Sequence, residues 1–226
     1  MMKKKELYIL IIPLILTTIL LISFIPKTKK DKLLFISDFL WYKYDFESND
    51  NINTSYIYPS LNSKQLLRYI EEDIKKIGTS SSLKQEIKES TSIYLSVGME
   101  DLIDIINVNY KEKKLSYDKE ILSLHADILI NQYQNIIEEI LLLNSNIKII
   151  SSSLYYPYPY IDDIELKDFY TNINNAIKEI NKNGDYLDLS TYSQEIYLDS
   201  INDYKLNTIA LNKIYNEIIN LNFLYH

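Results

Sequence analysis

The sequence contains no cysteine, only two histidines and only three glycines among its 226 residues. Without cysteine, the chain can form neither a disulfide nor a thiolate metal site. With His125 and His226 alone, it offers few histidines that could act as a general base. Apolar residues make up 46% and charged residues 24% of the chain, which is typical of a globular protein. The length suits one domain with a single core, plus an appendage.

The charge is divided unevenly along the chain. The first 32 residues contain seven lysines and two acidic residues, which gives them a net charge of +5. Because the whole chain has a net charge of −7, residues 33–226 carry a net charge of −12. Nucleic-acid binding needs a basic surface, and anionic lipid repels an acidic one. We therefore expect no nucleic-acid partner for the body of the chain.

A long apolar run lies near the amino terminus. Residues 7–25 contain no charge, and lysines flank both ends. At about 1.5 Å per residue, such a helix nearly spans a hydrocarbon core of roughly 30 Å. No small-residue cleavage signal follows, which favours an uncleaved signal anchor over a signal peptide. The sequence predicts a cytoplasmic tail at 1–6, a linker at 26–32 and an extracytoplasmic domain at 33–226, in a single-pass protein of the cell membrane.

Strand-like and helix-like segments alternate through this domain. The expected strands are 33–37, 55–58, 90–97, 147–154 and 186–189. The expected helices are 63–77, 100–107, 117–143, 165–181 and 207–222, and the third of these is expected to bury Ile121, Leu124, Ile128, Ile136, Ile140 and Leu143. Alternation of this kind predicts an α/β fold, with a three-layer, flavodoxin-like parallel sheet of about five strands.

In such sheets the ligand site lies beyond the carboxyl ends of the strands. Here those ends are 37–41, 58–63, 97–101 and 154–160, together with the loop before the last helix. We expect any functional residues to be found in these segments.

Three of these segments carry short motifs. Ser-Asp-Phe-Leu follows the first strand at 37–40, Gly-Met-Glu-Asp follows another at 98–101, and Asp-Tyr-Lys-Leu-Asn precedes the last helix at 203–207. In order and spacing they resemble the Gly-Asp-Ser-Leu, Gly-x-Asn-Asp and Asp-x-x-His-x-Asn motifs of the SGNH (GDSL-type) hydrolase superfamily. The resemblance covers roughly residues 33–222, and its closest form is the membrane-anchored bacterial lipase/acylhydrolase.

The resemblance implies that the catalytic positions are replaced. Phe39 stands for the nucleophilic serine, and an aromatic ring cannot attack a carbonyl. Ser60 stands for the oxyanion-hole glycine, and Glu100 for an asparagine whose amide would donate to an oxyanion. Leu206 stands for the general-base histidine, while Asp203, the acid that orients it, is retained. The pattern is that of a pseudoenzyme.

Several other positions keep the residue of the family or border its cleft. These candidates for a cleft or binding surface are Ser37, Asp38, Gly98, Asp101, Tyr155, Tyr156, Tyr158 and Asn207. The tyrosines, with Tyr160, could stack on the sugar rings of a cell-envelope glycan or on a peptide. They could equally do no more than cover the end of the sheet.

Four interpretations follow from these observations. The first is a catalytically inactive binding or scaffolding module at the cell surface, and the second is an active lipase or ester hydrolase in which Ser37 is recruited as nucleophile. In the third, carboxylates of Asp38, Glu100, Asp101 and Asp203 gather to bind a cation or to act as acid and base, against the simpler role of capping helices. In the fourth, a reversed anchor holds the domain at the inner membrane face. The sequence itself suggests no cofactor and no metal.

Overall fold

The computed structural model describes residues 32–38, 54–57, 61–75, 81–194, 197–198 and 205–223. The predicted anchor and cytoplasmic tail lie outside these residues, as do Phe39, Ser60, Asp203 and His226. Within the described part of the chain, no helix combines the length and apolar character that crossing a membrane requires.

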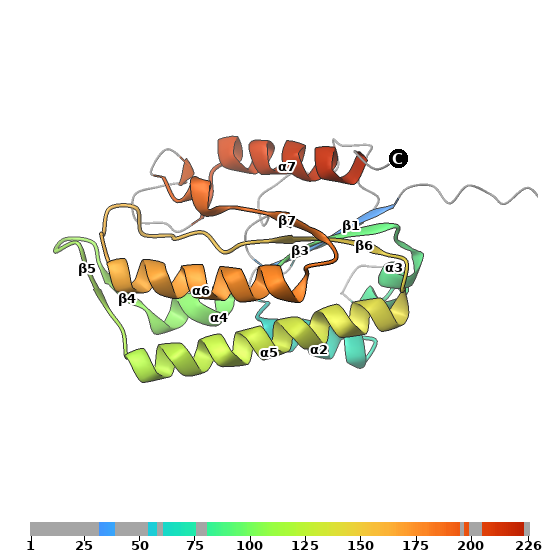
Figure 1. The fold of residues 1–226 in the computed structure, drawn as a ribbon, viewed down its shortest axis with the longest axis horizontal. Coiled ribbons are helices and arrows are strands. Elements are labelled where there is room, and N and C mark those ends of the chain that lie inside the picture. Colours follow the sequence, from blue (N-terminus) through green and yellow to red (C-terminus); the bar gives the residue numbers. More distant parts are fainter. Residues whose placement is uncertain are drawn as a thin grey trace, which may run out of the picture. The chain divides into compact units, whose positions relative to one another are not determined.

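A five-stranded parallel sheet forms the centre of the domain (Figure 1). Its strands are β1 (Leu33–Ser37), β2 (Thr54–Ile57), β3 (Ser92–Ser96), β6 (Lys148–Ser152) and β7 (Asp185–Leu187), in the spatial order β2-β1-β3-β6-β7. Each neighbouring pair is parallel. Counted within the sheet alone, this order is 2-1-3-4-5, so the predicted flavodoxin-like α/β fold is confirmed.

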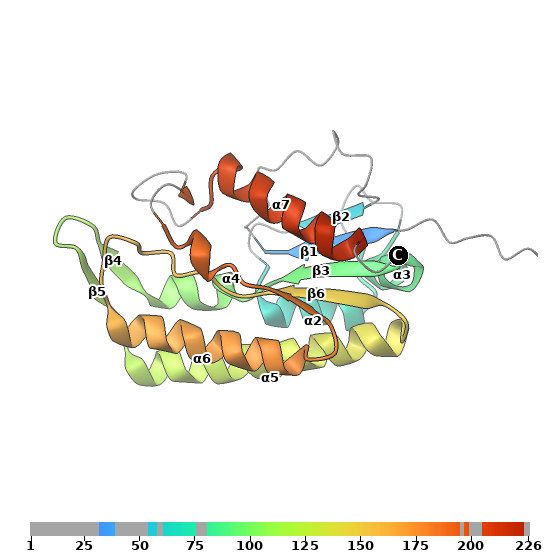
Figure 2. The ribbon, with the colours of Figure 1, turned by 45° about the horizontal axis from the view of Figure 1, so that its top comes forward.

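Helices cover both faces of the sheet. They are α2 (Ser63–Glu71), α3 (Leu83–Glu89), α4 (Met99–Leu102), α5 (Lys119–Leu143), α6 (Ile164–Ile180) and α7 (Thr208–Phe223), with 3₁₀ turns η2 (Ile103–Ile105) and η3 (Ser190–Tyr192). Figures 1 and 2 show α7 on one face, and α2, α5 and α6 on the other. The helices begin where side chains can accept backbone N–H groups, as Asn62, Asp118 and Asp163 do for α2, α5 and α6.

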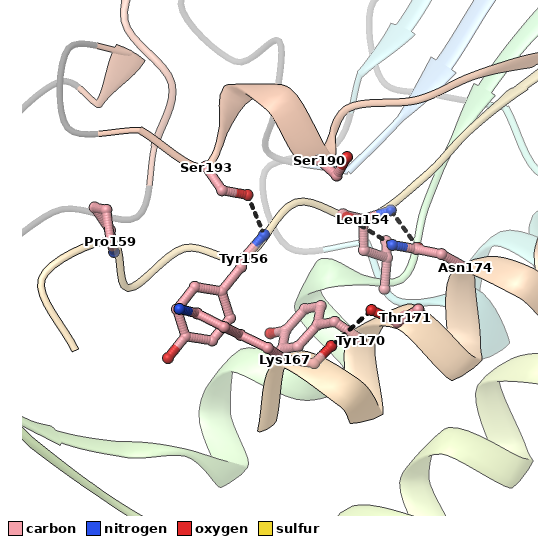
Figure 3. Close-up of a pocket in the computed structure, with 9 residues that line it drawn as sticks. All are labelled: Leu154, Tyr156, Pro159, Lys167, Tyr170, Thr171, Asn174, Ser190 and Ser193. Carbon is pink, nitrogen blue, oxygen red and sulfur yellow. Dashed lines mark hydrogen bonds between the residues drawn. The ribbon is translucent and has the colours of Figure 1, made fainter. Parts of the chain in front are cut away.

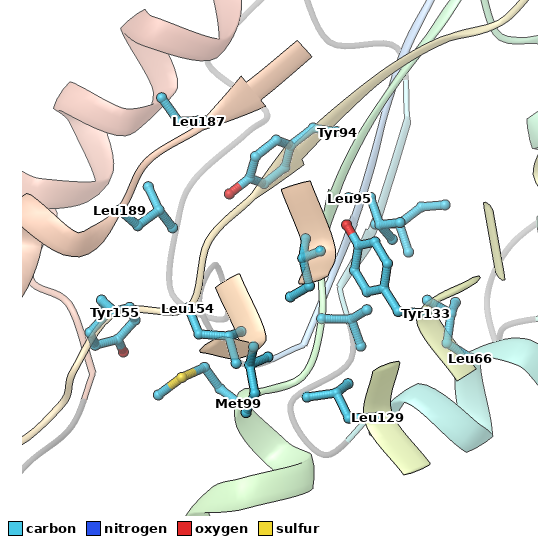
Figure 4. Packing of buried hydrophobic residues seen from close by; sticks show 14 of the residues in the cluster. Leu66, Tyr94, Leu95, Met99, Leu129, Tyr133, Leu154, Tyr155, Leu187 and Leu189 are labelled. Atoms are coloured by element: carbon cyan, nitrogen blue, oxygen red, sulfur yellow. The ribbon is translucent and has the colours of Figure 1, made fainter. Parts of the chain in front are cut away.

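The central strands β1, β3 and β6 are buried on both faces, and their side chains alternate between the two layers of helix. On the α7 face, the Phe35 ring lies 5.1 Å from that of Tyr94 and 6.3 Å from that of Tyr215, centroid to centroid. On the opposite face, Tyr133 of α5 packs near Leu66 of α2 (Figure 4). Burial on both sides explains why these strands read as continuous apolar runs in the sequence.

The structure corrects three details of the predicted elements. On α5, Ile121, Leu124 and Ile128 are exposed; the residues buried there are Leu122, Ala126, Leu129, Tyr133, Ile136, Ile137 and Ile140. The predicted helix 100–107 is shorter, and a hairpin of β4 (Asn107–Asn109) and β5 (Lys114–Ser116) follows it. The helix predicted at 63–77 ends at Glu71, and α3 was not predicted.

Candidate functional site

The carboxyl end of β1 is tied to the loop that follows β3. The backbone N–H of Asp38 donates to the Ser96 carbonyl at 3.1 Å, and the Asp38 carboxylate accepts the Met99 N–H at 3.1 Å. Asp38 is only 1% exposed. Its two hydrogen bonds hold the carboxyl end of β1 against the loop that follows β3. Ser37 beside it is fully buried, and its hydroxyl has no hydrogen-bond partner among the described residues.

Gly98 shapes the second loop. Its φ of +128° lies where residues other than glycine are strained. A Cβ atom there would also come within 3.0 Å of the Leu129 side chain. Gly98 turns the chain sharply from β3 into α4, and this turn presents the Met99 N–H to Asp38. The backbone conformation and the close approach of Leu129 therefore explain why the predicted motif has a glycine at this position.

Glu100 follows in an acidic environment. Burial raises the pKa of Glu100, and the neighbouring Asp104 and Asp101 carboxylates raise it further. The Lys205 ammonium, in the segment before α7, acts in the opposite direction.

Asp101 binds a buried serine rather than a substrate. Its carboxylate accepts the Ser63 N–H at 2.9 Å and the Ser63 hydroxyl at 2.6 Å. His125 of α5 lies on the other side, with Nδ1 3.2 Å from the Asp101 carbonyl oxygen. Burial raises the pKa of Asp101, although the two bonds from Ser63 oppose that shift.

This cluster contains serine, aspartate and histidine, but it is not a catalytic triad. In a triad the histidine lies between the hydroxyl and the acid, so that it can take the proton of the nucleophile. Here the acid contacts the hydroxyl directly, and Ser63 is fully buried. His125 therefore has no nucleophile to activate at this position.

Leu206 and Asn207 have structural roles before α7. Leu206 is buried and pairs with Leu198 in an isolated bridge. The Asn207 side chain accepts the Ala210 N–H at 3.1 Å and donates to the Leu198 carbonyl at 3.2 Å. Asn207 therefore caps the first turn of α7 and fixes the preceding loop, and its amide is used within the protein.

The tyrosine loop after β6 does not form an exposed stacking surface. Tyr155, Tyr156 and Tyr158 are all buried. The Tyr156 ring meets those of Tyr158 and Tyr170 edge-on, at centroid distances of 5.5 and 6.0 Å. Its hydroxyl donates to the Ile161 carbonyl at 2.8 Å. Of the two roles considered for these tyrosines, their burial fits the second, in which the rings cover the end of the sheet.

A cavity of about 290 Å³ lies beside this loop, between α6 and η3 (Figure 3). Its lining residues are Leu154, Tyr156, Pro159, Lys167, Tyr170, Thr171, Asn174, Ser190 and Ser193. Asn174 holds Leu154 through both its amide oxygen and its amide nitrogen, at 2.7 and 2.8 Å. The Ser193 hydroxyl accepts the Tyr156 N–H at 2.8 Å. The walls are therefore fixed by the protein's own hydrogen bonds.

Lys167 gives the cavity a cation. Its ammonium lies 5.3 Å from the centre of the Tyr156 ring and 2.6 Å from an Asp162 carboxylate oxygen. With the hydroxyls of Thr171 and Ser190, it could bind a small polar ligand. Sequence analysis missed these residues because three separate segments supply them, and no local pattern marks them.

No group of three residues able to hold a metal ion occurs in the described part of the chain. Of the four carboxylates weighed above, Asp38 binds Met99, Asp101 binds Ser63, and Asp203 lies outside the described residues. Asp38 and Asp101 therefore serve local structure, which is the simpler of the two roles considered for them.

No family model matches this sequence, and no curated protein matches it. Solved structures do resemble it. The lipase Lip_vut3 from a goat rumen metagenome has a TM-score of 0.64 at 14% identity, over 85% of this chain and 97% of that one. A lipolytic protein of the G-D-S-L family from Veillonella parvula has a TM-score of 0.52 at 12% identity, over 86% and 99%. A lipase/acylhydrolase from Enterococcus faecalis has a TM-score of 0.51 at 10% identity, over 84% and 93%.

Proposed function

We propose that this chain, which has the fold of the SGNH (GDSL-type) hydrolases, is a membrane-anchored, extracytoplasmic domain. It no longer hydrolyses esters and serves as a binding or scaffolding module at the cell surface. The observation behind this proposal is the sequence at the carboxyl edge of the sheet, where the motif resemblance aligns Glu100 and Leu206 with two catalytic positions of the family.

Ester hydrolysis on this fold needs a nucleophile, a base that takes its proton, and donors for the oxyanion. Leu206 cannot move a proton. His125, the histidine that the structure describes, lies on α5, and its ring contacts the backbone carbonyl of Asp101 in α4. An ionised Glu100 accepts hydrogen bonds and repels a developing oxyanion. Phe39, by its place in the sequence motif, removes the nucleophile.

A binding role is supported by what the carboxyl edge does contain. The bond between Asp38 and Met99 holds the strand ends, and Asn174 and Ser193 hold the loop after β6. The cavity between α6 and η3 offers the Lys167 ammonium and the hydroxyls of Thr171 and Ser190, which suit the hydroxyl groups of a sugar of a cell-envelope glycan. A preformed cavity limits the ordering cost of binding.

The enzymatic alternative is tested by assaying the full-length chain in detergent on short p-nitrophenyl esters. An active esterase of the same fold, in the same detergent, is the positive control. We expect no turnover above buffer from the wild type, and none from Ser37→Ala. Turnover by the wild type that Ser37→Ala abolishes would show an active hydrolase with a rearranged site.

Binding is tested by titrating the same protein with soluble N-acetylglucosamine oligomers. Lys167→Ala is expected to weaken binding about tenfold, because it removes a charged hydrogen-bond donor from the wall of the cavity. Lys178→Ala is the matched control, since Lys178 lies on the same helix and over another ring, 5.5 Å from the centre of Tyr186. Equal losses in both variants would exclude the cavity as the site.

Location is tested separately on intact cells. The uncharged run 7–25, with a tail of six residues before it, supports an anchor that leaves the domain outside. Added protease is therefore expected to remove the domain from intact cells. Protection until the cells are lysed would place the domain on the inner side.

A further inference from the structure

Two leucines of α5 are exposed near the amino-terminal ends of the strands, which form the edge of the sheet opposite the candidate site; we call this edge the amino edge. Leu141 and Leu142, at the end of α5, are 41% and 78% exposed. Figure 1 shows this end of α5 on the same side of the molecule as the start of β1. A shallow cavity of about 110 Å³ adjoins them, with Ile137, Leu141, Ile147, Ile149 and Ile180 among its lining residues. We call Leu141, Leu142 and this cavity the amino-edge surface.

Hydrogen bonds place the amino-edge surface close to the point where the chain enters the domain. Asn144, directly after α5, donates to the carbonyls of Ile87 and Ser90 at 3.1 and 2.9 Å. The next residue, Thr91, donates its N–H to the Lys32 carbonyl at 2.9 Å. Lys32 is the residue before β1. The hydrogen bonds of Asn144 and Thr91 therefore connect the end of α5 to the start of β1.

Lysines at this edge have carboxylate partners. The Lys32 ammonium lies 2.5 Å from Glu86 and 3.3 Å from Glu89. The Lys148 ammonium lies 2.8 Å from Asp185. Beside the leucines themselves, Glu138 and Glu139 lie one turn earlier on α5 and add negative charge. An uncharged apolar contact is therefore more favourable here than binding to anionic groups.

The sequence limits how far this edge can lie from a membrane. The predicted anchor ends at residue 25 and β1 begins at Leu33, so seven residues connect them. At no more than about 3.5 Å per residue, they reach roughly 25 Å. The amino edge is where that connection arrives, whereas the candidate site lies at the far end of the strands.

We propose that the amino-edge surface rests on the bilayer that holds the predicted anchor, with Leu142 and Leu141 among the lipid headgroups. This inference depends on the anchoring in the proposed function. The partner is a zwitterionic lipid surface, because the acidic body is repelled by anionic lipid. The contact turns the carboxyl edge and its cavity away from the membrane, toward ligands outside the cell.

The absence of cysteine allows a direct test, since a single introduced cysteine is the sole labelling site. Leu142→Cys is made in the full-length chain, labelled with a fluorophore sensitive to polarity, and reconstituted into phosphatidylcholine vesicles with or without nitroxide-labelled lipid. We expect blue-shifted emission and at least twofold quenching by the nitroxide lipid.

Leu124→Cys is the matched control. Leu124 is also an exposed leucine of α5, at 58%, but it lies 18 residues earlier, about 27 Å along the helix. Its label is expected to keep the emission of water and to escape quenching. Far-UV circular dichroism and thermal unfolding of both labelled proteins show that each is folded.

The possible outcomes separate this inference from the one on which it depends. If the chain does not float with the vesicles, the anchor is absent and both proposals fail. If it floats but the label at 142 remains in water, or if both labels are quenched equally, the docking proposal alone is wrong. A blue shift at 142 in detergent, without quenching by nitroxide lipid in vesicles, would show contact between copies instead and would also overturn it.

Discussion

The two edges of the sheet differ in how they treat charge and backbone geometry. At the amino edge, Lys32 and Lys148 lie beside carboxylates. At the carboxyl edge, Glu100 and Asp101 both have raised pKa values, and Gly98 adopts a positive φ. Lysines at the amino edge have carboxylate partners, while the carboxyl edge places carboxylates close together and turns the chain at a glycine. The comparison teaches that the two ends of the same strands differ in how their charged groups are arranged.

The largest effect is expected at the amino edge, from Gly184→Ala. A Cβ atom at this position would lie 2.4 Å from the Ile149 carbonyl oxygen and 2.6 Å from the Asn181 side chain. Relief requires a shift of sheet backbone, so we expect a loss of about 3 kcal/mol in the free energy of unfolding, measured by urea denaturation. Asn183→Ala, at the exposed neighbouring residue, should change it by less than about 0.5 kcal/mol. Equal values for the two variants would contradict the close approach.

Gly98→Ala is expected to cost somewhat less, about 2 kcal/mol, because its main penalty is the positive φ. The contact at 3.0 Å is with the flexible Leu129 side chain, which can move. Urea denaturation measures the loss. Gly98→Ala combined with Leu129→Ala separates the two causes, since removing the side chain leaves the backbone strain in place. A full suppression of the Gly98→Ala penalty would show that steric contact, and not φ, requires the glycine.

The ion pairs of the amino edge are tested by Lys148→Met. This change leaves Asp185 without its ammonium partner and the Leu221 carbonyl without its donor. We expect a loss of about 1 kcal/mol in the free energy of unfolding, smaller at high salt. Lys182→Met, in an exposed pair with Glu179, is expected to change it little. If Lys182→Met lowered the free energy of unfolding by as much, the Lys148 pair would contribute no more to stability than an exposed surface pair.

The smallest effect has the opposite sign. Glu100→Gln removes one of three neighbouring carboxylates and should stabilise the protein by about 0.5 kcal/mol at neutral pH. A folded-state pKa above the unfolded value means that the carboxyl contributes stability at low pH and loses it as pH rises through the folded pKa. The advantage of glutamine should therefore disappear on acidification, when Glu100 is protonated. Thermal unfolding from neutral to acidic pH measures it.

The control for this prediction is Glu112→Gln, at an exposed position in the turn between β4 and β5. It should change stability by less than about 0.5 kcal/mol across the same pH range. A stabilising effect of Glu100→Gln that grew on acidification would mean that the carboxyl is held in its charged form by partners other than those described.

The sheet could be predicted well from the sequence, for a physical reason. Strands buried on both faces, such as β1 and β6, are short apolar runs that differ from the longer periodic pattern of the helices. The burial of Ile136 and Ile140 on α5 was predicted correctly, but the buried face of its first half was not, because the helix carries two apolar stripes at helical spacing. The stripe through Leu122 and Leu129 is buried and the one through Leu124 is exposed, a choice that packing makes and periodicity does not.

The candidate site was predictable only in part. Asp38, Gly98 and Glu100 follow strands directly, so their place at the carboxyl edge follows from the topology of a parallel sheet. The contacts of Asp101 with Ser63 and His125 join residues that are 38 and 24 positions apart, and nothing local marks them. The cavity beside Tyr156 likewise depends on how α6 and η3 meet the loop. The family positions Phe39, Ser60 and Asp203 lie outside the described residues, so their alignment remains a prediction.

The bond between the Asp38 carboxylate and the Met99 N–H has a wider consequence. It works as a mechanical joint between the ends of two strands, made by one carboxylate and one backbone N–H. A protein with such a joint can change its chemistry without having to rebuild its scaffold. Domains of this shape are therefore good starting points for engineered receptors, in which the loops can be redesigned while the joint is left untouched.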